Sequence, residues 1–423
     1  SFLIIPGYMF GKFLGFSQVG AYSVIALFAL MDAILIGLIA RKLGANLFAS
    51  MVGSLVFLFA TPFFPYAVSL YQHSISIFLI LSAIYVLIRW NNFVSISIVW
   101  LLIAASISID YPNLILMLPI GLFALVRFFV ISKREETLKI GLKLPYILSF
   151  IALLPPILFF LWFNQKSYGN PYQLAGTVPG VKAIDSQGKP TVPEGTSTGD
   201  LEKRVNPDLQ KKTSIGFFNT RNILNGLYVH FISADRGVIF YTPVILLGIL
   251  GAVYLFKKKP RVTTLLVGII SLNLVLYSMW GDPWGGWAFG SRYLIPSYGL
   301  MAIFISITLT KLGKKAIFIL FFFLVMTYSI SVNTLGALSS NRNPPTVEAV
   351  ALETLSKKKE KYTFERNWDF LLSNRSKSFI FQTFASRYIS AKQYYLIITS
   401  LIVVVSGSFL GFLYFSNKKE SHV

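Results

Sequence analysis

Apolar stretches about as long as a membrane-spanning helix recur along this chain, and they constrain its fold more than any other feature. A helix needs about 20 apolar residues to cross a bilayer, and a helix satisfies its own backbone hydrogen bonds there. We therefore expect an all-α fold, a polytopic integral membrane bundle of roughly eleven transmembrane helices. The predicted spans are 20–40, 45–64, 74–89, 93–109, 112–130, 144–163, 237–256, 262–280, 293–310, 316–334 and 394–415.

The composition excludes an ordinary soluble domain. Hydrophobic residues make up 55% of the chain and charged residues 13%, and the mean hydropathy is +0.65; soluble domains carry far more charge. A soluble protein with a net charge of +21 would suggest nucleic acid. Here the position of the basic residues explains the charge, so we expect a lipid bilayer and no nucleic acid as partner. The absence of cysteine excludes disulfides, thiolate metal sites and cysteine nucleophiles.

Lysine and arginine concentrate at every second junction between predicted spans. These junctions hold 17 of the 38 basic residues, whereas the intervening short junctions hold only Lys12 and Arg292. Short loops rich in Lys and Arg stay in the cytoplasm, so we expect a multi-pass protein of the plasma membrane. The basic junctions contain Arg41, Lys42, Arg89, Arg127, Lys133, Arg134, Lys139, Lys143, Lys257, Lys258, Lys259, Arg261, Lys311, Lys314, Lys315, Lys418 and Lys419.

The same alternation places two long polar loops outside the cytoplasm. The predicted division of the chain is an N-terminal transmembrane region 1–163, an outer loop 164–236, a second transmembrane region 237–334, an outer loop 335–393, and a last helix with its tail, 394–423. Within the second loop, apolar residues at helical spacing predict a helix over Thr346–Tyr362. An odd number of crossings that begins outside at Ser1 leads us to expect a further helix and loop upstream, the alternative being a processed N-terminus.

The polar residues most suited to chemistry lie in the predicted outer junction Trp280–Tyr293. Three Trp, four Gly, one Asp and one Arg occur within these residues. Trp284 and Trp287 could stack on a sugar or form part of an interfacial aromatic belt. Arg292 could hold a phosphate through its planar fork. The alternative is a tight loop in which Arg292 pairs with Asp282.

Further polar residues lie at other predicted outer ends. Arg236 enters the membrane beside Asp235, where it could bind an anion or reach toward the interface as an ordinary surface arginine. His73 could be a site residue or a hydrogen-bonded structural one. Asp110, next to Tyr111, could cap a helix or hold a ligand. Asp32 lies in mid-span, where we expect it to pair within the bundle or to be protonated.

Motifs of soluble enzymes do not occur in the sequence. We find no P-loop, no paired histidines at zinc-binding spacing and no Gly-x-Ser-x-Gly elbow. The order of several membrane-protein segments, however, resembles polyprenyl-phosphate-dependent glycosyltransferases of the GT-C fold, the protein mannosyltransferase-like group of bacteria and archaea. The resemblance covers roughly residues 1–300. The segments that carry it are Ser1–Tyr8, Ile39–Gly44, Asn164 with Tyr168–Pro171, Asp235–Pro243 and, most specifically, Trp284–Pro296.

This resemblance implies transfer of a sugar, with inversion, from a polyprenyl-phosphate donor to a protein, lipid or glycan acceptor at the outer face. The departing phosphate would need cations, and an acid would take the acceptor proton. For the donor phosphate the candidates are Arg236, Arg292 and His73. For the sugar or acceptor they are Asp282, Asp110, Tyr111, Trp284, Trp287 and Tyr293.

The chain departs from this family at one point. Its members place an acidic residue in the first outer loop, whereas no acid precedes Asp32 here. We therefore expect the catalytic base upstream of Ser1, and the catalytic residue stays unassigned. Some members use a divalent metal, so a metal cofactor is possible, but the sequence assigns no metal ligand.

Two other classes of function stay open. A secondary transporter would also have many spans, with ionisable groups near the bilayer midplane; only Asp32 is clearly mid-span, and the other candidates lie at outer ends. A non-catalytic subunit of envelope assembly built on the same scaffold would fit a chain without its catalytic base.

Overall fold

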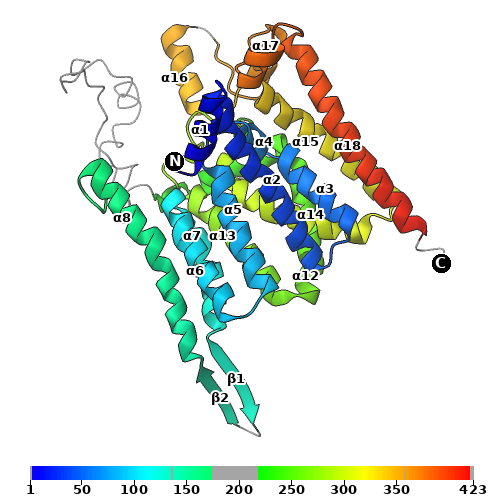
Figure 1. Ribbon diagram of the computed structural model, residues 1–423. Helices are drawn as coiled ribbons and strands as arrows, with labels where there is room; N and C mark the ends of the chain where they lie inside the picture. The colour runs from blue at the N-terminus through cyan, green and yellow to red at the C-terminus, as the bar shows by residue number, and fades with distance from the viewer. Residues whose placement is uncertain (1, 135–136, 174–217, 358, 420–423) are drawn as a thin grey trace.

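A computed structural model describes residues 2–134, 137–173, 218–357 and 359–419, and it shows a multi-span bundle of helices (Figure 1). Six helical segments of this described part are long and apolar enough to cross a membrane. They are Ser17–Leu43 (α2), Leu144–Tyr168 (η2 and α8), Pro260–Ser278 (α13), Arg292–Leu312 (η7 and α14), Ala316–Leu338 (α15) and Ala391–Lys419 (α18). Each coincides with a predicted span.

Shorter apolar helices complete the bundle. Four of them coincide with predicted spans: Leu47–Phe59 (α3), His73–Arg89 (α5), Phe93–Ile109 (α6) and Asn113–Val126 (α7). A fifth, Phe2–Phe13, which contains α1 (Ile5–Phe13), was not expected. It packs along α2 because Gly7, Gly11 and Gly20 let the two backbones approach closely.

The predicted span 237–256 is not one continuous helix. It is divided into α11 (Val238–Tyr241), a 3-10 turn over Pro243–Leu247 and α12 (Gly248–Lys258). Pro243 has no N–H to continue the helix. Next to this break, the Thr242 hydroxyl donates to the carbonyl of Ala60 at 2.7 Å. Predicted span 45–64 is also interrupted, since α3 ends at Phe59 and a short helix, α4 (Phe63–Ala67), follows.

A β-hairpin departs from the all-α expectation. Strands β1 (Phe129–Arg134) and β2 (Thr137–Leu142) pair antiparallel, with Phe129 opposite Leu142 and Arg134 opposite Thr137. The hairpin extends from the bundle between α7 and α8 (Figure 1). The predicted basic junction at this place therefore forms a two-stranded ribbon over its described residues, whose backbone groups pair with each other.

Helix α14 (Ile295–Leu312) is the centre of the bundle. Ile303, Phe304 and Ile305 have no exposed surface, and α14 packs against α2, α3 and α12. Glycines permit this packing: a Cβ on Gly53 would lie 2.1 Å from the Ser306 hydroxyl oxygen, and one on Gly251 would lie 1.9 Å from the Phe304 carbonyl oxygen.

The predicted basic junctions gather at one end of the bundle, which we call the basic end. There the Lys259 ammonium donates to the carbonyl of Lys42 at 2.9 Å, and the Asn46 N–H donates to the Thr310 hydroxyl at 3.1 Å. Gly313 lies beside Asn417 near the end of α18. Loops that are far apart in the sequence therefore share one face, as an alternating topology requires.

Among the described residues, the opposite end carries the short helices α10 (Ile223–Phe231), α16 (Thr346–Ser356) and α17 (Glu365–Leu372) and a π-helical turn, Phe381–Ala385. We call this the cluster end. Helices α16 and α17 both lie at this end, away from the hairpin (Figure 1). The helix predicted over Thr346–Tyr362 is present but ends at Ser356. Much of the first predicted outer loop, residues 174–217, lies outside the described residues.

Candidate functional site

The loop between α13 and α14, residues 279–291, has a shape that depends on glycine. Gly285 and Gly286 have φ of +73° and +61°, a left-handed conformation that costs other residues energy. The Gly286 N–H donates to the Asp282 carboxylate at 2.6 Å and so closes the turn. A Cβ on Gly285 would lie 3.0 Å from Nε of Arg292, so the turn covers this arginine closely.

The Arg236 side chain anchors this loop through hydrogen bonds. Its guanidinium donates to the carbonyls of Trp284 (2.9 Å), Gly286 (2.9 Å) and Asn343 (3.0 Å) and to that of Asp235 (2.7 Å). The residue is only 1% exposed. Its N–H groups are thus committed to the protein's own carbonyls, which makes Arg236 a positioning residue and leaves it little capacity for the phosphate predicted from sequence.

Asp235 fixes the neighbouring segment. Its carboxylate accepts from the backbone N–H (3.0 Å) and the hydroxyl (2.8 Å) of Thr346, the first residue of α16. Free N–H groups at a helix start favour such an acceptor. Ala288 and Asn343 also exchange backbone hydrogen bonds, at 3.0 and 3.3 Å. Asp235 and Arg236 together therefore join the α13–α14 loop to the segment before α16.

Arg292 differs from Arg236 because its guanidinium is not committed to backbone carbonyls, and neither arginine forms an ion pair with the described residues. The Cζ of Arg292 lies 5.8 Å from the centre of the Tyr71 ring and 5.5 Å from that of Tyr293. Its Nε is buried without a hydrogen-bond partner. The ion pairs of the described residues do not include Arg292. The pair with Asp282 considered from sequence is therefore not formed, and the guanidinium is held by aromatic rings.

Two carboxylates lie within the electrostatic reach of Arg292. Burial raises the pKa of the Asp110 carboxyl to about 6, although a hydrogen bond with Gln72 and the charge of Arg292 both lower it. The pKa of Asp282 is also raised by burial of the carboxylate, against its hydrogen bond from Gly286 and the charges of Arg236 and Arg292. Asp110 follows the last residue of α6, so it approaches Arg292 from a different helix than Asp282.

Histidine and tyrosine complete this cluster. The His73 ring stacks on Tyr71 at 5.8 Å, and its Nε2 is buried without a hydrogen-bond partner. Tyr293 stacks on Tyr277 at 4.3 Å. The structure therefore brings four predicted site residues together around a fifth, Arg292. We call this set the Arg292 cluster: His73, Asp110, Asp282, Arg292 and Tyr293.

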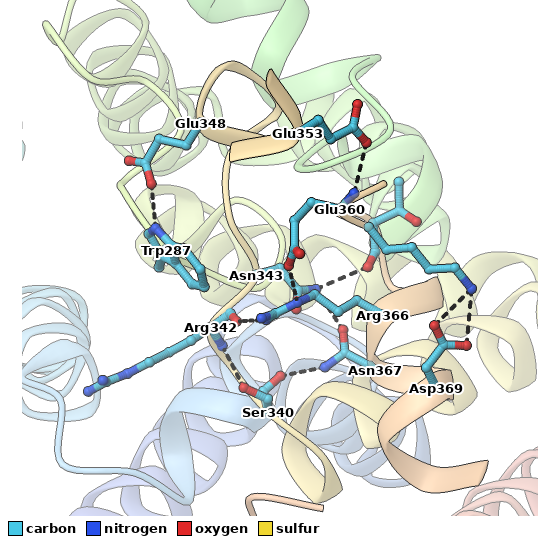
Figure 2. A network of polar contacts seen from close by, with 12 residues as sticks. Trp287, Ser340, Arg342, Asn343, Glu348, Glu353, Glu360, Arg366, Asn367 and Asp369 are labelled. Carbon is cyan, nitrogen blue, oxygen red and sulfur yellow. Dashed lines mark hydrogen bonds and ion pairs between the residues drawn. The ribbon is translucent and has the colours of Figure 1, made fainter. Parts of the chain in front are cut away.

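Other predicted site residues point elsewhere. The Trp287 indole N–H donates to Glu348 of α16, and the Arg366 guanidinium carbon lies 5.2 Å from the centre of the Trp287 ring (Figure 2). Trp284 contributes its carbonyl to Arg236. The Tyr111 ring packs on Phe160 of α8, with ring centres 6.0 Å apart. The rings of Trp287 and Tyr111 therefore contact side chains outside the cluster, and Trp284 contacts Arg236 and Asp282 through its backbone.

Sequence reasoning missed the residues that hold Arg292 in place. His230 contacts the Ser291 hydroxyl at 2.6 Å, and the Tyr298 hydroxyl donates to the Ser291 carbonyl at 3.1 Å. Burial lowers the pKa of His230 to about 4, so its ring is neutral at physiological pH. Tyr66, whose hydroxyl accepts from the Phe289 N–H at 2.9 Å, and Tyr71, which lies in the segment Tyr71–Ser74 with His73, were not predicted as site residues, because tyrosine is common in this chain.

The described residues contain no group of three His, Cys, Asp or Glu side chains placed to hold a metal ion. Asp110 and Asp282 alone do not form such a site, so no step is assigned to a metal. Comparisons with known proteins found no matching family model, no similar curated protein and no similar solved structure.

Proposed function

We propose that this protein is a membrane glycosyltransferase, which moves a sugar from a polyprenyl-phosphate donor to a protein, lipid or glycan acceptor at the extracytoplasmic face. One observation carries the proposal: Arg292 lies by two tyrosine rings, without an ion pair, within electrostatic reach of Asp282 from its own loop and of Asp110 from the end of α6. A partly desolvated arginine that is not neutralised by an acid is suited to an anionic ligand.

The orientation is part of this proposal. About eleven crossings with the basic end in the cytoplasm would place the Arg292 cluster at the outer membrane interface. The basic junctions lie at one end of the bundle and the Arg292 cluster lies at the other, as this orientation requires. A lipid-linked donor could then bring its phosphate to the cluster while its tail stays in the bilayer.

The reaction requires three tasks from the protein. An acceptor oxygen attacks the anomeric carbon of the sugar, and the bond from that carbon to the phosphate oxygen breaks with its electron pair on the phosphate. Arg292 would stabilise the charge that develops on the departing phosphate. Asp282 would bind sugar hydroxyls, and Tyr293 would supply an adjoining ring face.

The third task is removal of the acceptor proton. Among the described carboxylates near Arg292, Asp110 suits this task, because its pKa of about 6 leaves it ionised at neutral pH yet more basic than an ordinary carboxylate. An acid contributed by another part of the protein, as the family resemblance implies, would leave Asp110 to orient hydroxyl groups. An Asp110→Asn variant that retains transfer would support that second assignment.

The test is transfer by the full-length protein in bilayers, followed as release of lipid phosphate from a polyprenyl-phosphate sugar. Arg292→Lys keeps the charge but loses the planar fork, so we expect a loss of about a hundredfold or more in rate. Arg375→Lys, an exposed substitution at the same end, is the matched control. Near-wild-type release by Arg292→Lys would contradict the proposal. Donor binding without release in the wild type would support a non-catalytic subunit.

A transporter is the second candidate, and Asp32 is the observation that favours it. This carboxylate lies in the middle of α2, is fully buried, and has no hydrogen-bond partner for either oxygen. Such groups in membrane helices often carry protons. Asp32→Asn should abolish proton-coupled uptake into vesicles if the protein is a transporter. A glycosyltransferase should instead release lipid phosphate at a normal rate in this variant.

A further inference from the structure

A cavity lies at the cluster end, beside the Arg292 cluster. It has a volume of about 820 Å³ and extends from Tyr71 and Trp287 to the segments 336–342 and 377–380. Tyr22 of α2 forms part of its wall. Tyr71 also contacts Arg292 through its ring, so this side chain separates the cavity from the cluster.

The charged side chains that line this cavity are both basic. Arg342 and Lys377 contribute to its wall, and none of the described lining residues is acidic. Serine hydroxyls and an amide lie beside them, at Ser339, Ser340, Asn341 and Ser378. Two cations with hydroxyl and amide donors, and no carboxylate to neutralise them, match the requirements of an anion.

Buried hydrogen bonds hold the backbone that presents Arg342. The Asn367 amide donates to the Ser339 hydroxyl (2.8 Å) and to the Ser340 carbonyl (2.5 Å). The Asn343 amide donates to Asn367 at 2.6 Å. Arg366 donates to the carbonyl of Arg342 at 2.7 Å. The segment is therefore fixed on both sides of Arg342 by side chains of α17.

The side chain of Arg342 takes no part in that network. Figure 2 shows it extending away from the network that surrounds its backbone, and its guanidinium forms no hydrogen bond or ion pair with the described residues. Arg342 is exposed and its backbone is fixed, so its guanidinium is available to an anion at the cavity wall.

Lys377 reaches the same cavity from the other segment. Its backbone N–H donates to the Ser339 carbonyl at 2.7 Å, which links the two segments directly. Its ammonium lies 5.2 Å from the centre of the Phe370 ring, a contact that leaves its hydrogens available to a ligand. Asn341 donates to Ser69 at 2.8 Å and so joins this wall to the chain between α4 and α5.

We propose that this cavity is a second anion-binding site, in which Arg342 and Lys377 bind a phosphate-type group. The site goes beyond the proposed sugar transfer, and it stands whether or not transfer occurs. The phosphate group could belong to a lipid headgroup or to a free phosphate compound, since both present the same oxygens to these cations.

The experiment titrates the full-length protein in neutral detergent with two probes. One arm uses inorganic pyrophosphate and the other uses short-chain phosphatidylglycerol, with short-chain phosphatidylcholine as the zwitterionic reference. We expect saturable binding of at least one anionic probe. Binding of both probes indicates a site for free phosphate groups, whereas binding of the lipid alone indicates a headgroup site.

The decisive comparison is between two double variants of equal charge change. Arg342→Gln with Lys377→Gln should weaken binding about tenfold to a hundredfold, as expected when charged hydrogen bonds are lost. Arg375→Gln with Lys392→Gln, both exposed in the same region, should leave it unchanged. Failure of the wild type to bind either probe, or equal binding by both double variants, would overturn the site.

Folding is checked independently of binding. The single variants Arg342→Gln and Lys377→Gln alter exposed side chains, so each should elute and unfold like the wild type while binding the probe more weakly. Sugar transfer is not a readout here. A negative result therefore removes this cavity as a site and leaves the outcome for Arg292 unaffected.

Discussion

The two ends of the bundle use the same basic side chains in opposite ways. At the basic end, Lys257, Lys258 and Lys314 are exposed to solvent. At the cluster end, Arg236 is buried under four carbonyls, and Arg292 lies between aromatic rings. Exposed cations contribute little to stability, but their number orients a chain in the membrane. Buried cations shape the backbone or bind ligands, and their surroundings decide which.

The largest expected effect is all-or-none and concerns the sides of the membrane. The chain has no cysteine, so Lys258→Cys and Arg375→Cys each introduce a single thiol, one at each end. An impermeant maleimide should label Arg375→Cys in intact cells, and Lys258→Cys only after the membrane is opened. If both label from the same side, the two ends are not separated by a membrane.

Arg236→Gln should have the largest effect on stability. The substitution removes the charged donors for the carbonyls of Trp284, Gly286 and Asn343. Buried acceptors without a partner are costly, so we expect a loss of about 3 kcal/mol or more in the free energy of unfolding. Thermal unfolding in detergent measures it, with Arg375→Gln as control. A melting temperature close to that of the wild type would show that the loop does not depend on Arg236.

Gly285→Ala tests whether the loop positions Arg292. The positive φ costs about 1–2 kcal/mol, and the new Cβ would lie 3.0 Å from Nε of Arg292 and 3.2 Å from the Tyr293 ring. Gly169→Ala is the matched control, because its φ is +71° and no atom lies within 4 Å. Both variants should lose similar stability, whereas only Gly285→Ala should slow transfer, by up to about a hundredfold. Equal transfer rates for Gly285→Ala and Gly169→Ala would contradict the positioning of Arg292 by this loop.

Asp110→Asn should change how stability depends on pH. The pKa of Asp110 is about 6 in the folded protein, above the roughly 3.9 of an unfolded aspartate. The folded state therefore holds the proton more tightly, and stability falls as the pH rises from about 4 to about 6. Asparagine removes this loss, so the variant should gain up to about 3 kcal/mol over the wild type at pH 7.5, since two pKa units correspond to about that free energy.

The internal control for Asp110 is the same comparison at pH 4. The Asp110 carboxyl, with its pKa of about 6, is then protonated in nearly all folded molecules. The difference in stability between variant and wild type should therefore shrink. A difference that does not vary with pH would mean that the substitution acts through packing and not through ionisation.

The smallest effect is expected at the basic end. Lys257→Gln with Lys258→Gln changes two exposed side chains, so the free energy of unfolding should change by less than about 0.5 kcal/mol for each. Thermal unfolding measures this change beside that of Arg236→Gln. A loss as large as that for Arg236 would mean that burial does not distinguish the two ends.

Most helices were predictable because hydrophobicity is a local property. Every predicted span contains helix in the structure, including the interrupted one that ends in α12. The breaks were harder to place. Pro243 marks one break in the sequence, but the hydrogen bond from Thr242 to Ala60 that accompanies it joins residues 182 positions apart. The hairpin was not expected, since a basic loop and a short ribbon look alike when only charges are counted.

The candidate site was predictable in part. Its members lie at the outer ends of predicted spans, so a shared depth was readable from the sequence, and the structure brings His73, Asp110, Asp282 and Arg292 together. The difference between Arg236 and Arg292 was not readable. Both follow polar residues at an outer helix start, and only the contacts show that one is committed to carbonyls.

The sequence alone determined that this protein lies in a membrane as a bundle of helices with a basic end, because transfer into lipid depends on the composition of each segment. Tertiary structure decided which charged groups are buried, paired or free. Arg236 donates to the carbonyl of Asn343, 107 positions away in the sequence. The backbone around Arg342 is fixed by hydrogen bonds with Asn367 of α17. Such contacts depend on how distant segments pack, which no local pattern encodes.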